Sequence, residues 1–516
     1  MRSLAGAPRT AMLPPRPERS PGRQSWGRVM CMACIDISGL VTPGVDACHC
    51  GSPTTVNAFR RIEADLKRRE FLGGTAAVLG MFAGFGLAPH ETQAQTPPRP
   101  ILLTHLRFFD GSTLRMQEGR DILVDGGRIQ ALPARGQGPQ DAQTIDCGGR
   151  AVIPGLIDAH WHSTLVAVSQ VAALTQDPAF IHLMAGREAG ATLRRGFTTV
   201  RDVGGPAFGL KQAIDVGAVE GPRIFPSGAM ISQTSGHGDF RLRSELPRFP
   251  GTPPNAIEQQ GVALIADGAD QVLRAAREQL MKGASQLKIM AGGGVSSPYD
   301  PIDTTQYTER EMRAAVEAAE DWGTYVCAHV YTSQGIRRAI AAGVKCIEHG
   351  QLADDATVKL MADQGVWWSI QPFLADEDAN QYSDPRQQAK QREVSEGTVR
   401  AFELLRKHKL KLAFGTDILF NPAGAVSQGR QLAKFARYMS PLEALHKATG
   451  AAGELLALSG PRAPYDGPLG VIAPGALADL LVVDGEPDKS LNWLDTPDTS
   501  LRLIMKGGRL AKQTLA

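Results

Sequence analysis

The chain has 516 residues, of which 43% are hydrophobic and 21% charged, a composition that excludes a wholly disordered or fibrous protein. Its net charge of +2 comes from the front: residues 1–94 carry 11 Lys and Arg against 7 Asp and Glu, and the remaining residues carry 44 against 46. Because a near-neutral body offers no basic surface, we expect no nucleic-acid partner.

Residues 1–60 are rich in Pro, Arg, Ser and Gly and contain Cys31, Cys34, Cys48 and Cys50. The CxxC and CxC spacings could indicate a zinc knuckle. We favour the simpler interpretation that this segment is disordered or precedes the true start of translation.

Residues 61–94 have the pattern of a twin-arginine export signal. Lys67-Arg-Arg-Glu-Phe-Leu-Gly73 leads into an apolar, Gly-rich run, and Thr92-Gln-Ala94 supplies small residues for cleavage. The alternative, a membrane anchor, is disfavoured by the glycines of the run and its short length. We predict a periplasmic or secreted protein that begins near Gln95 and keeps no stable membrane anchor.

Both ends of the mature chain have β-strand patterns. Val124-Asp-Gly-Gly-Arg-Ile129 is typical of a hairpin, and the same pattern returns at Ala478–Val483 and Leu503–Arg509. We predict one small β-sandwich built from residues 95–153 and 463–516.

Residues 154–462 alternate between strand-like and helix-like segments. Glu309–Ala319 and Gln334–Ala342 have clear helical periodicity. We count eight candidate strands: Val152–Ala159, Thr198–Val203, Arg223–Met230, Gln286–Met290, Tyr325–Ala328, Cys346–Glu348, Trp367–Gln371 and Leu412–Gly415. These units predict an α/β fold, a TIM (β/α)8 barrel. A doubly wound sheet is the second choice, because no GxGxxG follows a strand; Ala291-Gly-Gly-Gly294 ends a strand without a prompt helix.

His160 and His162 end the first barrel strand. Because side chains alternate along a strand, both imidazoles should point the same way, and imidazole is the commonest ligand for zinc-like metals. In a TIM barrel the functional residues lie at the carboxyl ends of the strands. Four further residues lie at such positions, Lys288, His329, His349 and Asp417. We expect all six side chains to converge on one mouth.

Lys288 is unusual in this set, because an ammonium cannot bind a metal. A buried lysine can lose its proton and take up carbon dioxide as a carbamate, which could bridge two metals. The alternative is a lysine that extends to solvent at the strand end, and Asp417 could likewise be a structural cap. Cys327 shares the inward face with His329, where a core thiol is expected rather than a ligand.

Residues 100–516 resemble the amidohydrolase superfamily, in its imidazolonepropionase-like and Xaa-Pro-dipeptidase-like (prolidase, ochratoxinase-type) branch. The strings that carry the resemblance are Pro154-Gly-Leu-Ile-Asp-Ala-His-Trp-His162, Thr198-Thr-Val-Arg-Asp202, Ser235-Gly-His-Gly-Asp239, Leu287-Lys-Ile289, Ala328-His-Val-Tyr331, Ile347-Glu-His-Gly350, Gly415-Thr-Asp417 and Pro474-Gly-Ala-Leu-Ala-Asp479.

The resemblance implies a zinc-dependent hydrolase with two divalent metal ions. His160, His162 and Asp417 would hold the more buried ion, His329 and His349 the more exposed one, and carbamylated Lys288 would bridge them. A metal-bridging hydroxide would attack the substrate, with Asp417 as the catalytic proton shuttle. The presence of Lys288 argues against an imidazolonepropionase proper, because enzymes of that kind look mononuclear and lack this lysine.

The expected substrate is a small molecule, a dipeptide or N-acyl amino acid cut at its amide bond. Tyr331 lies two residues after His329 and could bind the substrate carboxylate, with His237 and Arg337 as further candidates; a packed Tyr and a surface Arg are the alternatives. Other possible functions are a lactonase, esterase or phosphotriesterase, a cyclic amide hydrolase, or a non-catalytic metal-binding scaffold, which would be expected to have lost Lys288 or Asp417. We also predict a homo-oligomer.

Overall fold

The computed structural model describes residues 99–249, 251–297 and 299–515. The predicted disordered segment and export signal lie outside these residues. Among the described residues, no helix has the length and apolar character needed to cross a membrane.

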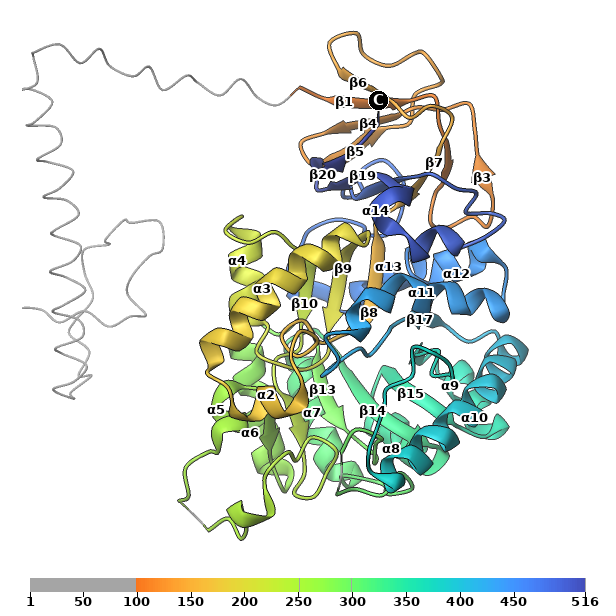
Figure 1. The fold of residues 1–516 in the computed structure, drawn as a ribbon. Coiled ribbons are helices and arrows are strands. Elements are labelled where there is room, and N and C mark those ends of the chain that lie inside the picture. Colours follow the sequence, from red (N-terminus) through yellow and green to blue (C-terminus); the bar gives the residue numbers. More distant parts are fainter. Residues whose placement is uncertain (1–98, 250, 298, 516) are drawn as a thin grey trace, which may run out of the picture. The chain divides into compact units, whose positions relative to one another are not determined.

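The two ends of the described chain form adjoining sheets (Figure 1). One has the order β5-β4-β1-β6 and consists of β1 (Ile101–Thr104), β4 (Ile122–Asp125), β5 (Arg128–Ala131) and β6 (Gln143–Asp146). The other has the order β20-β19-β18-β7-β2-β3 and consists of β2 (Arg107–Phe109), β3 (Met116–Gln117), β7 (Ala151–Pro154), β18 (Leu480–Val483), β19 (Leu501–Lys506) and β20 (Arg509–Gln513). Both sheets contribute to one buried apolar cluster that includes Leu103, Val124, Val482 and Met505.

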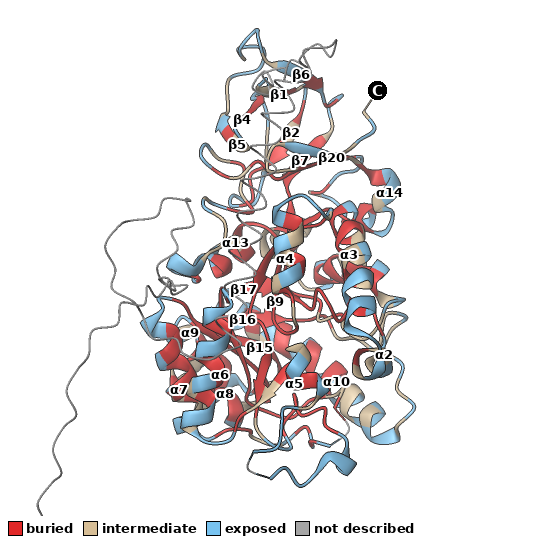
Figure 2. Ribbon diagram, turned by 90° about the vertical axis from the view of Figure 1, so that its left-hand side faces the viewer, coloured by how far each residue is buried: buried red, intermediate tan, exposed pale blue. Residues whose placement is uncertain are grey.

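The middle of the chain is of the TIM-barrel type, with parallel strands inside and helices outside (Figure 2). A three-stranded sheet contains β8 (Leu156–Trp161), β9 (Phe197–Asp202) and β10 (Arg223–Pro226). A seven-stranded sheet has the order β12-β11-β13-β14-β15-β16-β17. Its strands are β11 (Met230–Ser232), β12 (Ala263–Ile265), β13 (Leu287–Met290), β14 (Val326–Thr332), β15 (Cys346–Leu352), β16 (Trp367–Ile370) and β17 (Leu412–Phe414).

At each edge of the three-stranded sheet, a single backbone hydrogen bond connects it to the seven-stranded sheet. The Asp417 N–H donates to the His160 carbonyl (2.8 Å), next to β17 and β8, and the Ser285 N–H donates to the Pro226 carbonyl (2.8 Å), next to β13 and β10. The ladders themselves therefore form two sheets rather than one continuous cylinder.

The connecting helices follow from local sequence signals. Thr308 caps α7 (Glu309–Asp321) in a capping box with Glu311, and Met312, Ala315 and Val316 form its buried face. The predictions for α7 and α8 (Ser333–Ala342) are confirmed. The other helices are α2 (Gln170–Thr175), α3 (Pro178–Arg194), α4 (Phe208–Asp215), α5 (Ala256–Gln260), α6 (Ala269–Met281), α9 (Asp355–Asp363), α10 (Pro385–His408), α11 (Gln428–Ala433), α12 (Pro441–Lys447), α13 (Gly450–Ala457) and α14 (Pro497–Ser500).

Two strand predictions were wrong in detail, and one strand was missed. The predicted strand Val152–Ala159 divides at Gly155 into β7 and β8, where a Cβ would lie 2.1 Å from Thr198 Oγ1. The predicted strand Arg223–Met230 ends at Pro226, and Gly228 with φ +75° turns the chain into β11. Strand β12 was missed because it has only three residues.

Candidate active site

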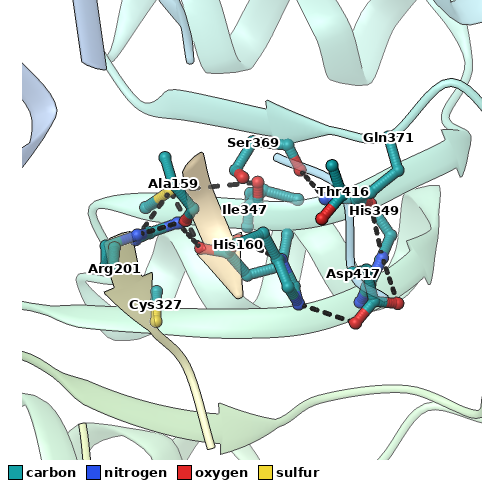
Figure 3. A network of polar contacts seen from close by, with 12 residues as sticks. Ala159, His160, Arg201, Cys327, Ile347, His349, Ser369, Gln371, Thr416 and Asp417 are labelled. Carbon is teal, nitrogen blue, oxygen red and sulfur yellow. Dashed lines mark hydrogen bonds and ion pairs between the residues drawn. The ribbon is translucent and has the colours of Figure 1, made fainter. Parts of the chain in front are cut away.

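The six predicted strand-end residues lie together. His160, His162, Lys288, His329, His349 and Asp417 line one cavity of about 330 Å³, which His237 also lines. Figure 3 shows His160, His349 and Asp417 turned toward one another. Ligand atoms of these three residues lie within 4.8 Å of one another, close enough to hold one metal ion.

Each histidine of this set has one ring nitrogen bound to a neighbouring oxygen. His160 Nδ1 lies 2.7 Å from Glu348 Oε2, and His162 Nδ1 lies 2.9 Å from the Gly204 carbonyl. His329 Nε2 lies 3.2 Å from the Gly293 carbonyl, and His349 Nδ1 lies 2.7 Å from Gln371 Oε1. Because these oxygens only accept, each bound nitrogen must carry the proton, which leaves the other nitrogen with a free lone pair.

Three electron-pair donors therefore face one another. His160 Nε2 and His162 Nε2 each lie 3.1 Å from Asp417 Oδ1. The buried His160 Nε2 has no hydrogen-bond partner within the described part of the chain. Lone pairs at this separation repel unless a cation lies between them, so the donor set fits a divalent metal ion.

Lys288, on β13, is 1% exposed and has no hydrogen bond or ion pair to any described residue. An ammonium buried without a partner is costly. Lys434 provides a contrast: it is 5% exposed, and its Nζ lies 2.8 Å from carboxylate oxygens of both Asp376 and Asp378. Lys288 thus differs from Lys434 in lining the inner cavity without a carboxylate partner among the described residues.

Backbone conformation directs two of these side chains. Along β14, Cys327, His329 and Tyr331 share one face, as strand alternation predicts. His349 directly follows Glu348, yet both point to the site, because His349 has φ +71°. Asp417 has φ +55°. Non-glycine residues in this left-handed region are strained, and such strain clusters at functional sites.

Burial sets the charge state of His329 and His349. It lowers the pKa of His329 and His349 well below the usual value, so both rings are neutral at neutral pH, the form that binds metals. Burial would raise the pKa of the Asp417 carboxyl, but a proton held between its oxygen and the His160 and His162 nitrogens, where a metal ion would otherwise lie, outweighs burial and holds that pKa well below its usual range. Asp417 is therefore ionised.

A second, larger cavity of about 800 Å³ opens from the first. The two cavities share His237, His329 and Asp417, and Tyr331 lines only the larger one. Tyr331 is 3% exposed and stacks on His349 with ring centroids 5.0 Å apart. Burial raises the pKa of its phenol well above the usual value, so it stays an O–H donor.

The candidate substrate residues differ in position. His237 stacks on His329 with ring centroids 4.1 Å apart, and its Nδ1 lies 3.3 Å from Asp300 Oδ2. Arg337 does not reach either cavity: its side chain is 48% exposed and its Nη1 lies 3.4 Å from Asp354 Oδ2. The prediction that Arg337 adds charge to the site is not supported, because α8 directs its side chain to the surface.

Sequence reasoning missed the residues that hold the imidazoles from behind. Glu348, Arg201 and Gln371 are each fully buried polar side chains in strands or at a strand end. Charged residues within buried strands were the available signal, because Arg201 and Glu348 both lie in the sequence strings that carry the family resemblance. The expectation of a buried core thiol at Cys327 is confirmed.

Comparison with known proteins finds relatives over most of the described residues. A model of the amidohydrolase family matches residues 151–511. The ochratoxinase of Aspergillus niger is 32% identical over 373 residues, covering 70% of this chain and 75% of the ochratoxinase. A prolidase solved in complex with N-methylphosphonate-L-proline has a TM-score of 0.74 at 36% identity, covering 80% of this chain and all of the other. A Xaa-Pro dipeptidase with methionine bound in its active site has a TM-score of 0.69 at 29% identity, covering 80% and 99%.

The chain therefore belongs to the amidohydrolase family, in the Xaa-Pro-dipeptidase-like branch that its motifs predicted. These neighbours imply a TIM-barrel-type fold and support a hydrolase that acts on amide bonds.

Proposed function

We propose that this protein is a two-metal hydrolase that cleaves the amide bond of a dipeptide or N-acyl amino acid and releases a carboxyl-terminal amino acid. The observation that carries the proposal is the convergence of His160 Nε2, His162 Nε2 and Asp417 Oδ1 beside a buried lysine that has no described partner. An apolar core would stabilise the fold at least as well as these buried polar groups. Their presence together therefore points to a functional role.

The division of the ligands between two ions follows the family resemblance. His160, His162 and Asp417 would hold one ion, and His329 and His349 the second; nitrogen and oxygen donors suit zinc. Lys288 would lie between them as a carbamate. Its neutral Nζ attacks the carbon of carbon dioxide, the new C–N bond forms, and one proton leaves to water. This step converts a neutral amine into an anion in a site suited to binding cations.

Two bound divalent ions would polarise the scissile carbonyl and lower the pKa of a water molecule. The chain's own part is proton transfer and binding. Asp417 accepts a proton from the attacking water and delivers it to the leaving nitrogen as the amide C–N bond breaks. Its depressed pKa keeps it ionised and able to accept that proton.

The substrate class rests on the junction between the two cavities. Tyr331 and His237 both line the larger cavity next to Asp417, where a phenol O–H and an imidazole could bind a substrate carboxylate. A prolidase with a proline phosphonate and a dipeptidase with a bound amino acid are among the structural neighbours, which supports a ligand with a free carboxylate.

A substrate panel tests the proposal. Zinc-loaded protein is assayed on Xaa-Pro and other dipeptides, N-acyl amino acids, the cyclic amide imidazolone propionate, lactones and aryl phosphotriesters. We expect the highest kcat/KM on an amide with a free carboxylate, and a higher KM when that carboxylate is blocked as a methyl ester. Fastest turnover of a lactone or phosphotriester would overturn the substrate class, and protein that binds no divalent metal would overturn the proposed site.

A further inference from the structure

A charged pair lies buried behind His160. Arg201, on β9, and Glu348, on β15, are both 0% exposed, and Arg201 Nη2 donates to Glu348 Oε1 over 2.6 Å. Buried ion pairs can often be replaced by apolar side chains without loss of stability. This pair therefore calls for a role beyond holding the strands together.

The second oxygen of Glu348 reaches the candidate metal site. Glu348 Oε2 accepts from His160 Nδ1 over 2.7 Å, which places the proton on Nδ1 and the lone pair on Nε2. Arg201 also holds the backbone just before this ligand, because its Nε donates to the Ala159 carbonyl over 2.6 Å. Figure 3 shows Arg201 beside the strand that carries Ala159 and His160.

His160 differs in this respect from the other candidate ligands. At the ring nitrogen that holds each imidazole from behind, His162, His329 and His349 hydrogen-bond to neutral oxygens, whereas His160 hydrogen-bonds to a carboxylate. A carboxylate makes the opposite ring nitrogen a stronger electron-pair donor than a carbonyl does. Arg201 balances the charge of Glu348, so that the carboxylate can stay ionised in a buried position.

We infer that Arg201 and Glu348 are positioning residues that fix the tautomer of His160 and strengthen its Nε2 as a ligand for the more buried metal. This inference rests on the proposed metal site. If so, the proton stays on Nδ1 of His160 only while an acceptor atom of residue 348 faces that nitrogen.

Glu348→Gln tests that statement with almost no change of shape. The guanidinium of Arg201 can only donate, so the Gln carbonyl must face Arg201 and the Gln NH2 must face His160 Nδ1. Nδ1 then has to accept, and the proton moves to Nε2, where it blocks the ligand lone pair. We expect a 10- to 100-fold loss of zinc affinity, measured by competition with a chelator. In the metal-free protein, ¹⁵N NMR of labelled histidine should show His160 changing from the Nδ1–H to the Nε2–H tautomer.

The double variant Arg201→Met/Glu348→Gln provides the rescue. Without Arg201, the Gln carbonyl is free to turn to His160 and restore the Nδ1–H tautomer, so the double variant should bind zinc more tightly than Glu348→Gln alone. Asp479→Asn is the matched control: it removes a carboxylate that is 3% exposed and lies 3.1 Å from Arg223, away from the metal site. It should leave zinc affinity unchanged.

Each outcome decides the inference. Wild-type zinc affinity in Glu348→Gln, or equal losses in the single and double variants, would overturn it. If Glu348→Gln does not fold, Glu348→Asp keeps an anion for Arg201 and withdraws it from His160, and unchanged zinc affinity in that variant would overturn it as well. Wild-type protein that binds no zinc at all would instead be a failure of the proposed metal site.

Discussion

The inner and outer parts of the active-site cavity are held in different ways. In the inner part, His160, His162, His329 and His349 are each at most 3% exposed, and each has its second ring nitrogen bound to a buried oxygen. The outer wall includes the segment after β16, α10 and α11, and the ion pair between Arg430 of α11 and Asp378 is partly exposed. The inner part is thus preorganised for one chemistry, whereas the wall can vary with the substrate.

Asp417→Asn should have the largest effect on turnover, because it changes the inner part. The amide oxygen can still contact His160 and His162 but cannot accept a proton. General acid–base groups contribute roughly 10²- to 10⁴-fold, so we expect kcat to fall by that factor while one metal equivalent is retained. Steady-state kinetics and metal analysis of the same preparation check this. A loss below tenfold would contradict the proton-transfer role.

Lys288→Ala should remove one of two metal equivalents. Without the bridging carbamate, two divalent ions at close range repel strongly. Metal analysis should show no more than one equivalent, and small carboxylates should partly restore activity. Two retained equivalents with full activity would exclude the carbamate.

Lys434→Met is the control for Lys288, because it removes an equally buried lysine from the outer wall. Lys434 neutralises Asp376 and Asp378, so its loss should lower the melting temperature. The two metals should remain, since neither carboxylate lines the inner cavity. Loss of metal from this variant would mean that the inner part and the wall are not independent.

The inner part could be predicted from sequence to the extent that strand geometry determines it. Alternation placed His329 and Tyr331 on one face of β14, and the carboxyl-end rule brought His160, Lys288 and Asp417 to one mouth. The orientation of His349 could not be predicted, because it depends on a left-handed backbone at a non-glycine residue. Nor could the partners behind the rings, since Glu348 and His160 are 188 residues apart.

The wall was less predictable because loops and helix faces determine it. Arg337 was proposed as a substrate residue because it lies on the helix after the His329 strand, but the direction of its side chain depends on how α8 packs. His237 was found from its Gly-flanked loop, yet its stacking on His329 also requires Gly294, where a Cβ would lie 2.1 Å from the His237 ring. Such close approaches between distant loops leave no simple pattern in the sequence.

Tyr331→Phe should have an intermediate effect that depends on the substrate. One hydrogen bond to a charged group is worth about 1.5–3 kcal/mol, so kcat/KM should fall about 10- to 150-fold on a substrate with a free carboxylate, mainly through KM. The methyl ester of the same substrate should be little affected. Equal losses on both would mean that Tyr331 supports the metal ligands His329 and His349, on which it packs, instead of binding the carboxylate.

Arg337→Ala should have the smallest effect, which makes it the sharpest test of where the wall ends. The guanidinium is about half exposed and pairs with Asp354 at 3.4 Å, outside both cavities. Exposed ion pairs contribute about 0–1 kcal/mol, so the melting temperature should scarcely change. Because the side chain lines neither cavity, kcat/KM on a carboxylate substrate should change less than about twofold, within the energy of a rearranged surface pair. Arg337→Ala should be assayed beside Tyr331→Phe. A comparable rise in KM in both variants would show that α8 reaches the bound substrate and that the wall extends beyond the residues that line it in this structure.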